Sequence, residues 1–202
     1  MQFAFTDEQE LLRREARDVL ANGGWAKDEV AELGFLDRAV LYEEAGRAGR
    51  GEEFFESSAP ANERLAALSL EAVGIGAKAL ELAVEYAKSR EQFGKPIGTY
   101  QAVSHQLADT YVEIELARSL AYWAAWCVAE NDEQVDVACA AAKVYCGDAA
   151  VAACERSIQI HGGIGFTWEH VLHVYYKRAQ WIQAYGGYAS KHRARIAAHL
   201  LD

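Results

Sequence analysis

Proline is scarce in this sequence, and basic residues are in deficit. Pro60 and Pro96 are the only prolines among 202 residues, so long helices can run without interruption over most of the chain. Acidic residues outnumber lysine and arginine by 30 to 20, which gives a formal net charge of −10. Because nucleic acids and anionic membranes attract basic surfaces, this charge argues against either as a partner.

Features of secreted, membrane-spanning and metal-binding proteins are also missing. The N-terminus lacks a basic segment followed by an apolar run, so we expect no signal peptide. The most apolar stretch, residues 116–129, contains Arg118 and is too short to span a bilayer. No C-x-x-C pair occurs among the four cysteines, Cys127, Cys139, Cys146 and Cys154. We therefore predict buried free thiols in a reducing cytoplasm and no metal site, with zinc binding or a disulfide framework as the alternative.

Hydrophobic periodicity predicts an all-α protein, because no segment shows the sustained alternation of a strand. Three short helices are expected over residues 7–20, 25–33 and 36–47. After Pro60 five more are expected, the first three of them long: residues 65–86 with Asn62 as the N-cap, 100–129, 134–160, 168–181 and 190–201. Long helices joined by short turns predict an antiparallel four-helix bundle with short N-terminal helices before it.

The change in texture at Pro60 divides the chain into three parts. Residues 1–48 form an N-terminal helical segment, residues 49–60 a linker, and residues 61–202 the bundle. Within the linker, Phe54 and Phe55 are expected to dock on a core. The buried face of the first long helix is predicted from its 3–4 spacing to comprise Leu68, Ala72, Ile75, Ala79, Leu82 and Tyr86.

The turn after the first long helix holds an unusual set of side chains. Residues 90–97 read REQFGKPI, and a helix end followed by a tight turn would explain Gly94 and Pro96. Helix termination alone would not require the other residues of this cluster together: Arg90, Gln92, Phe93 and Gln101.

A second cluster follows the third long helix. Residues 159–166 read QIHGGIGF and begin with Gln159. Three glycines occur in four residues, namely Gly162, Gly163 and Gly165. Glycines let a backbone approach a ligand closely and present N–H groups to a phosphate or ribose. Helix C-termini also use glycine for their own termination, so this cluster alone leaves both interpretations open.

Together and in this order, the two clusters resemble the C-terminal helical domain of the acyl-CoA dehydrogenase family. The resemblance covers residues 62–200 and includes LAVEYAKSREQFG at residues 82–94 and the stretch 159–168. Residues 1–45 resemble a shortened form of the family's N-terminal helices. Where the family places a middle β-domain, this chain has only residues 46–60.

The resemblance implies FAD as the cofactor and an acyl-CoA, or another acyl thioester, as the substrate. It implies that Arg90, Gln92, Phe93 and Gln101 contact the adenosine-diphosphate (ADP) half of FAD. It also implies that a neighbouring subunit contributes the second cluster, Gln159, Gly162, Gly163 and Gly165. Flavin binding across an interface requires an oligomer, either a homo-oligomer or a heteromer with a full-length acyl-CoA dehydrogenase that supplies the β-domain.

The resemblance further implies a catalytic base. Most family members carry it as the Glu of a Tyr-Glu-Gly segment, but here that position is Gly186. A minority carry it at the start of the helix that precedes the Arg90 turn, where this chain has Glu63, with Arg64 next to it to orient the carboxylate. A carboxylate beside an acyl chain and shielded from water is a competent base. The alternative is that Glu63 is a first-turn acid that stabilises the helix dipole.

These features predict an acyl-CoA dehydrogenase-like flavoprotein, or a subunit of one, that introduces an α,β double bond into an acyl thioester with FAD. The alternative is a non-flavin protein that reuses the bundle. Such a protein would be a structural partner subunit or an acid–base enzyme of the dehydratase or cyclase type.

Overall fold

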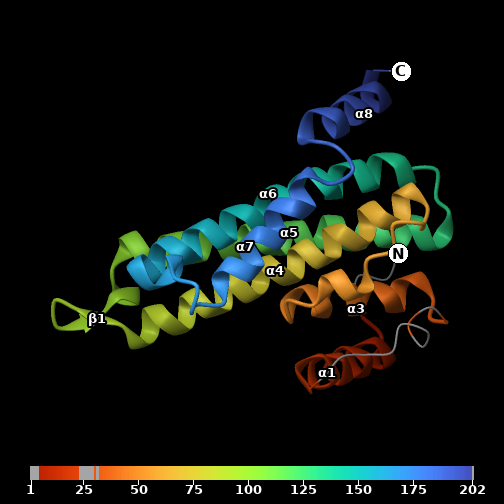
Figure 1. The fold of residues 1–202 in the computed structure, drawn as a ribbon. Helices are drawn as coiled ribbons and strands as arrows, with labels where there is room; N and C mark the ends of the chain where they lie inside the picture. Colours follow the sequence, from red (N-terminus) through yellow and green to blue (C-terminus); the bar gives the residue numbers. More distant parts are fainter. Residues whose placement is uncertain (1–4, 23–29, 31, 202) are drawn as a thin grey trace.

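The computed structural model describes residues 5–22, 30 and 32–201 (Figure 1). The fold is all-α, as predicted, and the long helices form an antiparallel bundle (Figure 1). Of the short helix predicted over residues 25–33, most positions lie outside the described residues.

The elements follow the predicted order. Two helices precede the linker: α1 (Asp7–Asn22) and α3 (Phe35–Arg47). The bundle consists of α4 (Ala61–Ser89), α5 (Gln101–Glu130), α6 (Val135–His161) and α7 (Leu172–Ala184), and α8 (Ala189–Leu201) projects from it (Figure 1). Short 3₁₀ helices occupy the connections: η1 (Gly51–Phe54), η2 (Ile97–Thr99) and η3 (Gly162–Phe166). A small antiparallel hairpin pairs β1 (Glu91–Gln92) with β2 (Lys95–Pro96).

Helix α4 is central and contacts α3, α5, α6 and α7. Of its predicted buried face, Leu68, Ala72, Ile75 and Ala79 are buried, whereas Leu82 and Tyr86 are half-buried.

The prediction of Asn62 as the N-cap of α4 is wrong. The helix begins at Ala61, directly after Pro60, whose φ of −51° suits a helix start. The Asn62 side-chain amide instead donates to Asp136 Oδ1 on α6 at 2.8 Å. The Asn62 side chain, which the local sequence predicted to cap α4, therefore forms a hydrogen bond between α4 and α6 instead.

Helix α3 crosses α4 in direct backbone contact. A Cβ added to Gly46 would lie 2.1 Å from the carbonyl oxygen of Glu71. One added to Gly74 would lie 1.9 Å from the carbonyl oxygen of Glu43. Because only glycine permits this approach, the crossing itself holds the N-terminal helices on the bundle.

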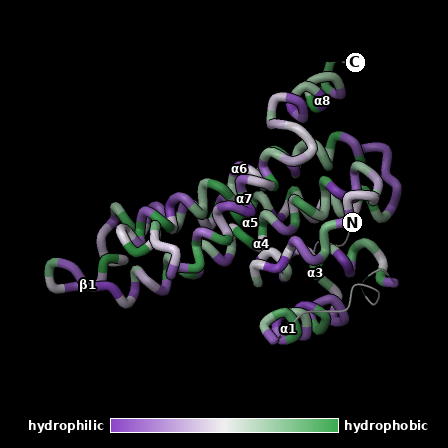
Figure 2. Tube along the Cα trace, in the orientation of Figure 1, coloured by the Kyte–Doolittle hydropathy of each residue, from purple (hydrophilic) through white to green (hydrophobic). Residues whose placement is uncertain are grey.

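Buried carboxylates on α3 join the N-terminal helices to α5. Glu44 accepts two hydrogen bonds from the Arg17 guanidinium of α1, at 2.8 and 2.9 Å. Glu43 accepts hydrogen bonds from Arg118 Nε and from the Tyr122 hydroxyl, each at 2.8 Å. Helix α1 carries both hydrophilic and hydrophobic positions (Figure 2), and its buried Ala16 and Leu20 pack with Leu41 and Ala45 of α3. Apolar contacts and ion pairs therefore both attach it.

The linker packs on the protein, as predicted for its two phenylalanines. Phe54 is buried against residues of α1 and α3. The Phe55 ring meets Trp181 and Tyr185 edge-on, with centroids 5.2 and 5.0 Å apart respectively. The linker therefore lies against the side of the bundle between α3 and α7.

Helix α6 is the apolar core helix. Among the described residues, 135–166 are long and apolar enough to cross a membrane by length and composition alone. The sequence predicted 116–129 as the most apolar stretch instead. Within residues 135–166, 61% of the most apolar window is buried inside the protein, as expected for a core helix. All four cysteines are buried and free, which confirms the prediction for the thiols. Burial raises the pKa of Cys139 and Cys154 to about 12.

Candidate functional site

Both sequence clusters lie at the end of the bundle where α4 ends and α7 begins (Figure 1). The first cluster forms the β1–β2 hairpin between α4 and α5, and the second forms η3 between α6 and α7. At the ends of α4 and α6, the ring of Tyr86 stacks on that of His161 with centroids 4.5 Å apart. The structure therefore places both clusters at the same end of one chain, whereas the resemblance implied that the second cluster reaches the cofactor from a neighbouring subunit.

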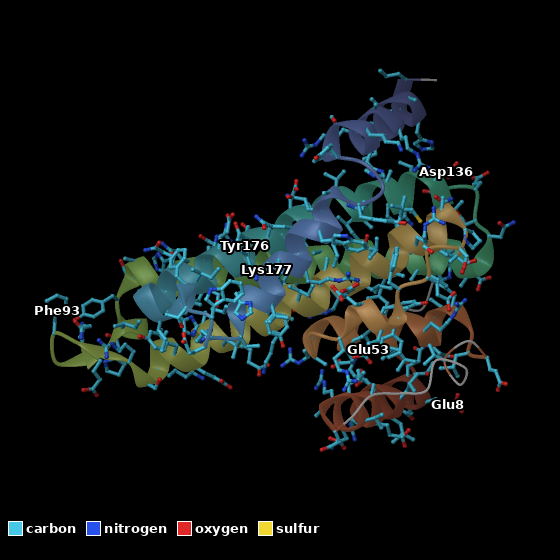
Figure 3. All side chains as sticks on the ribbon, in the orientation of Figure 1. Glu8, Glu53, Phe93, Asp136, Tyr176 and Lys177 are labelled. Carbon is cyan, nitrogen blue, oxygen red and sulfur yellow. The ribbon has the colours of Figure 1, made fainter. Side chains whose placement is uncertain are left out.

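The hairpin presents an aromatic side chain in an unfavourable backbone conformation. Phe93 and Gly94 form the tip, with left-handed φ values of 53° and 80°. Glycine adopts this conformation readily, whereas a bulky residue does so at a cost. The Phe93 side chain is 92% exposed and projects from the tip (Figure 3), with its ring 6.5 Å from that of Tyr100. Such a residue is typical of a surface that binds a ligand or another chain.

The polar residues of the hairpin face solvent. Arg90, Gln92 and Gln101 are all exposed. The backbone of Arg90 is fixed, because its N–H donates to the Tyr86 carbonyl at 2.8 Å and its own carbonyl accepts from Ile97 N–H at 2.8 Å. The backbone of Arg90 is thus fixed while its side chain is exposed.

The glycines of the second cluster have different roles. Gly162 has a φ of +65°, and a Cβ added there or at Gly163 would meet no atom within 4 Å, so the backbone at both positions is open to a ligand. A Cβ on Gly165 would lie 2.8 Å from the Ile158 carbonyl oxygen, so this glycine is required by packing within the loop. Gln159 is exposed one turn earlier.

We refer to these eight residues as the cradle: Arg90, Gln92, Phe93, Gln101, Gln159, Gly162, Gly163 and Gly165. Their chemistry fits the ADP half of FAD. A guanidinium pairs with a pyrophosphate, glycines without a side chain let phosphate or ribose oxygens approach the backbone closely, and an exposed ring can stack on adenine. The N–H of Gly162 itself already donates to the carbonyls that end α6. The described residues offer no comparable place for the flavin ring, since their only sheet is the small hairpin.

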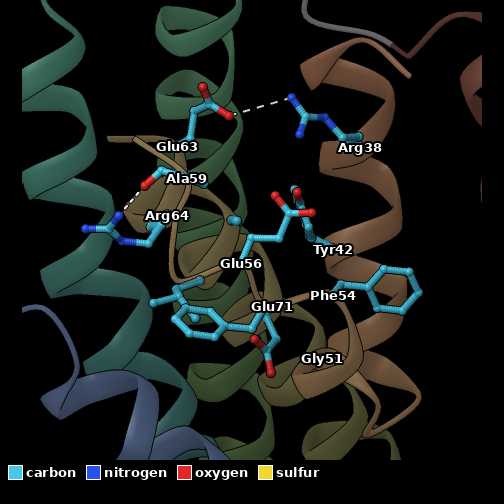
Figure 4. A pocket seen from close by; sticks show the side chains of 12 residues that line it. Arg38, Tyr42, Gly51, Phe54, Glu56, Ala59, Glu63, Arg64 and Glu71 are labelled. Atoms are coloured by element: carbon cyan, nitrogen blue, oxygen red, sulfur yellow. Dashed lines mark hydrogen bonds and ion pairs between the residues drawn. The ribbon is translucent and has the colours of Figure 1, made fainter. Parts of the chain in front are cut away.

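A second candidate site lies at the start of α4, where α3, the linker and α4 meet (Figure 4). Its pocket has a volume of about 20 Å³, which is room for about one water molecule. Its wall combines apolar residues, among them Phe54, Phe55 and Leu68, with six charged or polar ones: Arg38, Tyr42, Glu56, Glu63, Arg64 and Glu71. An acyl chain does not fit into this space in the chain alone.

Glu63 and Arg64 have separate partners in this pocket. The Glu63 carboxylate forms an ion pair with Arg38 of α3, with Oε2 and Nη2 3.6 Å apart (Figure 4). Arg64 donates instead to two linker carbonyls, that of Ser57 at 3.1 Å and that of Ala59. The contact expected between Arg64 and Glu63 is therefore replaced by one with Arg38, which sequence reasoning missed because it lies on another helix.

Gly186, the position of the base in most family members, approaches the same end of α4. A Cβ added to Gly186 would lie 3.3 Å from Leu65 Cδ2. Both possible base positions therefore lie near the first turns of α4. The cradle lies beyond its last turn, and at a rise of 1.5 Å per residue Glu63 and Arg90 are about 40 Å apart.

A buried ion pair near the pocket also escaped sequence reasoning. Glu71 accepts two hydrogen bonds from the Arg178 guanidinium, at 2.6 and 3.0 Å. Burial raises the pKa of Glu71 even though Arg178 opposes the shift. The pair joins α4 to α7 beneath Gly51, where an added Cβ would lie 1.9 Å from Glu71 Oε1. It closes the pocket on the side of the linker.

Comparison with known proteins agrees with this geometry. The family described as "Acyl-CoA dehydrogenase, C-terminal domain" matches residues 51–201. The match covers most of the chain, and the protein belongs to the acyl-CoA dehydrogenase family.

Similar proteins are longer than this chain. The acyl-CoA dehydrogenase IpdE2 of Mycobacterium tuberculosis is 45% identical over 112 residues, which are 55% of this chain and 33% of IpdE2. The structure of butyryl-CoA dehydrogenase from Megasphaera elsdenii superposes with a TM-score of 0.68 at 34% identity, covering 70% of this chain and 37% of the other. A steroid ACAD variant named Tcur3481-Tcur3483 gives a TM-score of 0.64 at 36% identity, covering 69% and 38%. The chain thus spans about a third of the length of such relatives.

Proposed function

We propose that this chain is a helical subunit of an acyl-CoA dehydrogenase-type flavoprotein, and that its cradle binds the ADP half of a FAD whose ring is held by a partner chain. The observation that carries the proposal is the hairpin tip. Phe93 is 92% exposed at a left-handed φ, beside the exposed side chains of Arg90 and Gln92. This conformation is costly for the chain alone, and a bound dinucleotide would compensate the cost.

The partner that we propose is a full-length acyl-CoA dehydrogenase that contributes a β-domain. Two observations support a second, unlike chain. The linker between α3 and α4 packs against the bundle, and the pocket beside Glu63 has a volume of about 20 Å³. In addition, the steroid ACAD at 36% identity carries two protein names, Tcur3481 and Tcur3483. The buried free thiols favour a cytoplasmic location for the complex.

The chemistry that we propose is the α,β-dehydrogenation of an acyl-CoA. FAD, when bound, accepts the hydride from the β-carbon while a carboxylate base takes the α-proton. The part of this chain in the reaction is to hold the cofactor: Arg90 pairs with the pyrophosphate, and the absence of side chains at Gly162 and Gly163 lets phosphate or ribose oxygens approach the loop. Glu63 remains a predicted base, and at about 40 Å from Arg90 it can act only on a flavin that another chain's cradle holds.

The test is co-expression with a full-length acyl-CoA dehydrogenase from the same organism, followed by native mass and visible flavin absorbance. We expect a heteromer that contains flavin. An Arg90→Ala complex should keep its mass and lose most of its flavin, whereas Arg14→Ala, which changes an exposed arginine on α1, should keep both. Glu63→Gln should also retain flavin.

Unchanged flavin in the Arg90→Ala complex would contradict the role of the cradle. A stable complex without flavin would favour a structural partner subunit. Flavin bound stoichiometrically by the chain alone would show that no partner β-domain is needed.

A further inference from the structure

The two halves of the cradle come from distant parts of the sequence, and a set of stacked rings lies between them. Tyr86 belongs to the last turn of α4, His161 is the last residue of α6, and His170 precedes α7. The ring of Tyr86 stacks on that of His161 at 4.5 Å with an interplanar angle of 29°. The His170 ring lies 4.5 Å from His161 on a tilted plane. The rings therefore connect the ends of three helices.

Two of the three rings, those of Tyr86 and His161, are attached directly to a part of the cradle. The Tyr86 carbonyl accepts a hydrogen bond from the Arg90 N–H at 2.8 Å, so Tyr86 is bonded directly to the residue at which the hairpin begins. His161 is covalently joined to Gly162, the first open glycine of the loop. A change in the distance between the Tyr86 and His161 rings would thus change the distance between the two phosphate-binding elements.

Burial and a hydrogen bond restrain the orientation of the His161 ring. It is 6% exposed, and its Nδ1 lies 2.7 Å from the Ser157 carbonyl oxygen one turn earlier. A carbonyl can only accept, so Nδ1 carries the hydrogen and the ring orientation is set by the α6 backbone. On the other side, His170 Nδ1 accepts the Leu172 N–H at 3.3 Å, which fixes that ring to the start of α7.

We propose that the Tyr86–His161–His170 ring stack positions the hairpin relative to the glycine loop, and so sets the spacing at which the cradle binds a dinucleotide. These are positioning residues, because they act through Arg90 and Gly162. The inference rests on the proposed function, since it assigns a role within the same cradle. Stacking requires the ring of Tyr86 and not its hydroxyl, and offset aromatic pairs of this kind stabilise beyond the area they bury.

The test is the dissociation constant for FAD of the complex, measured with Tyr86→Ala and Tyr86→Phe, together with a melting temperature for each variant. Tyr86→Ala should weaken FAD binding about tenfold or more, because a displacement of a binding group by about 1 Å has large effects. Tyr86→Phe should restore binding to near the wild-type value. Tyr145→Ala removes a half-buried tyrosine from the middle of α6 and should leave the affinity unchanged. If Tyr86→Ala does not fold, His161→Gln removes the second ring and should weaken binding in the same way.

Three results would overturn the inference. Wild-type affinity for FAD in a folded Tyr86→Ala or His161→Gln complex would refute the role of the ring stack. If Arg90→Ala still loses flavin, the proposed role of the cradle would stand. Equal losses in Tyr86→Phe and Tyr86→Ala would assign the effect to the hydroxyl. Retention of flavin by Arg90→Ala would remove the proposed function first, and the ring stack would lose its role with it.

Discussion

Replacing Gly74 with alanine should destabilise the protein, although alanine is the better helix former. In the middle of a helix, glycine to alanine normally stabilises by about 1 kcal/mol. Here the added Cβ would lie 1.9 Å from the Glu43 carbonyl oxygen, and the helices must separate by about 1.5 Å to restore ordinary contact at 3.4 Å. The obstacle is backbone, which no rotamer change can relieve, so the overpacking cost should reach about 3 kcal/mol. The net loss is then about 2 kcal/mol, or about 4–8 °C in melting temperature for a chain of this size.

The assay is thermal unfolding followed by circular dichroism, with Gly147→Ala as the matched control. Gly147 is an interior glycine of α6, and its added Cβ would lie 3.4 Å from Gln183 Cα, which is an ordinary contact. This control should gain up to about 1 kcal/mol from helix propensity alone. If Gly74→Ala melts at or above the wild-type temperature, the tight α3–α4 crossing is not what holds the N-terminal helices in place.

Two further predictions concern buried titratable groups. His192 is 1% exposed, and burial followed by the nearby Lys143 lowers the pKa of its imidazole below 6.5. Its contribution to the free energy of unfolding is therefore present above pH 6.5 and lost as the pH falls below it. Denaturant titrations should show that His192→Gln loses less unfolding free energy than the wild type as the pH falls. Equal losses in the two proteins would contradict this. The four thiols are buried and have raised pKa values. None should therefore react with an alkylating reagent in the native protein, and all should react after unfolding. Rapid alkylation of the native protein would disprove this prediction.

Helix bounds could be predicted where turn residues flank a long run of helix-forming residues. Helices α5 and α6 begin and end within about one residue of the predicted ranges 100–129 and 134–160. Helix α7 begins at Leu172 rather than at residue 168, because the glycine-rich connection continues as η3 and further turns before the helix. A local pattern records the tendency of a segment to be helical, but it does not record how far an irregular connection extends.

Contacts between helices could not be predicted in the same way. Arg178 and Glu71 form a buried pair although they lie 107 positions apart, and nothing in either local sequence indicates the other. Glu63 pairs with Arg38 for the same reason: a helix crossing, set by glycines elsewhere on α3 and α4, brings them together. The sequence therefore indicated which residues form the candidate sites, but not which charges neutralise one another.

Helix α4 separates the two regions of chemistry that the sequence suggested. Its 29 residues put Glu63 in the first turn and Arg90 directly after the last, about 40 Å away along a rigid and largely buried helix. Under the proposed function, a FAD with its ADP half in this cradle could not also place its ring beside Glu63 of the same chain, so the cradle would serve the flavin of a neighbour. The linker can then pack beside the pocket at Glu63, and Arg38 can pair with the carboxylate, without affecting the end of the bundle that we propose to bind the dinucleotide. In the proposed arrangement, these helices would complete a flavin site for which a partner chain supplies the β-domain.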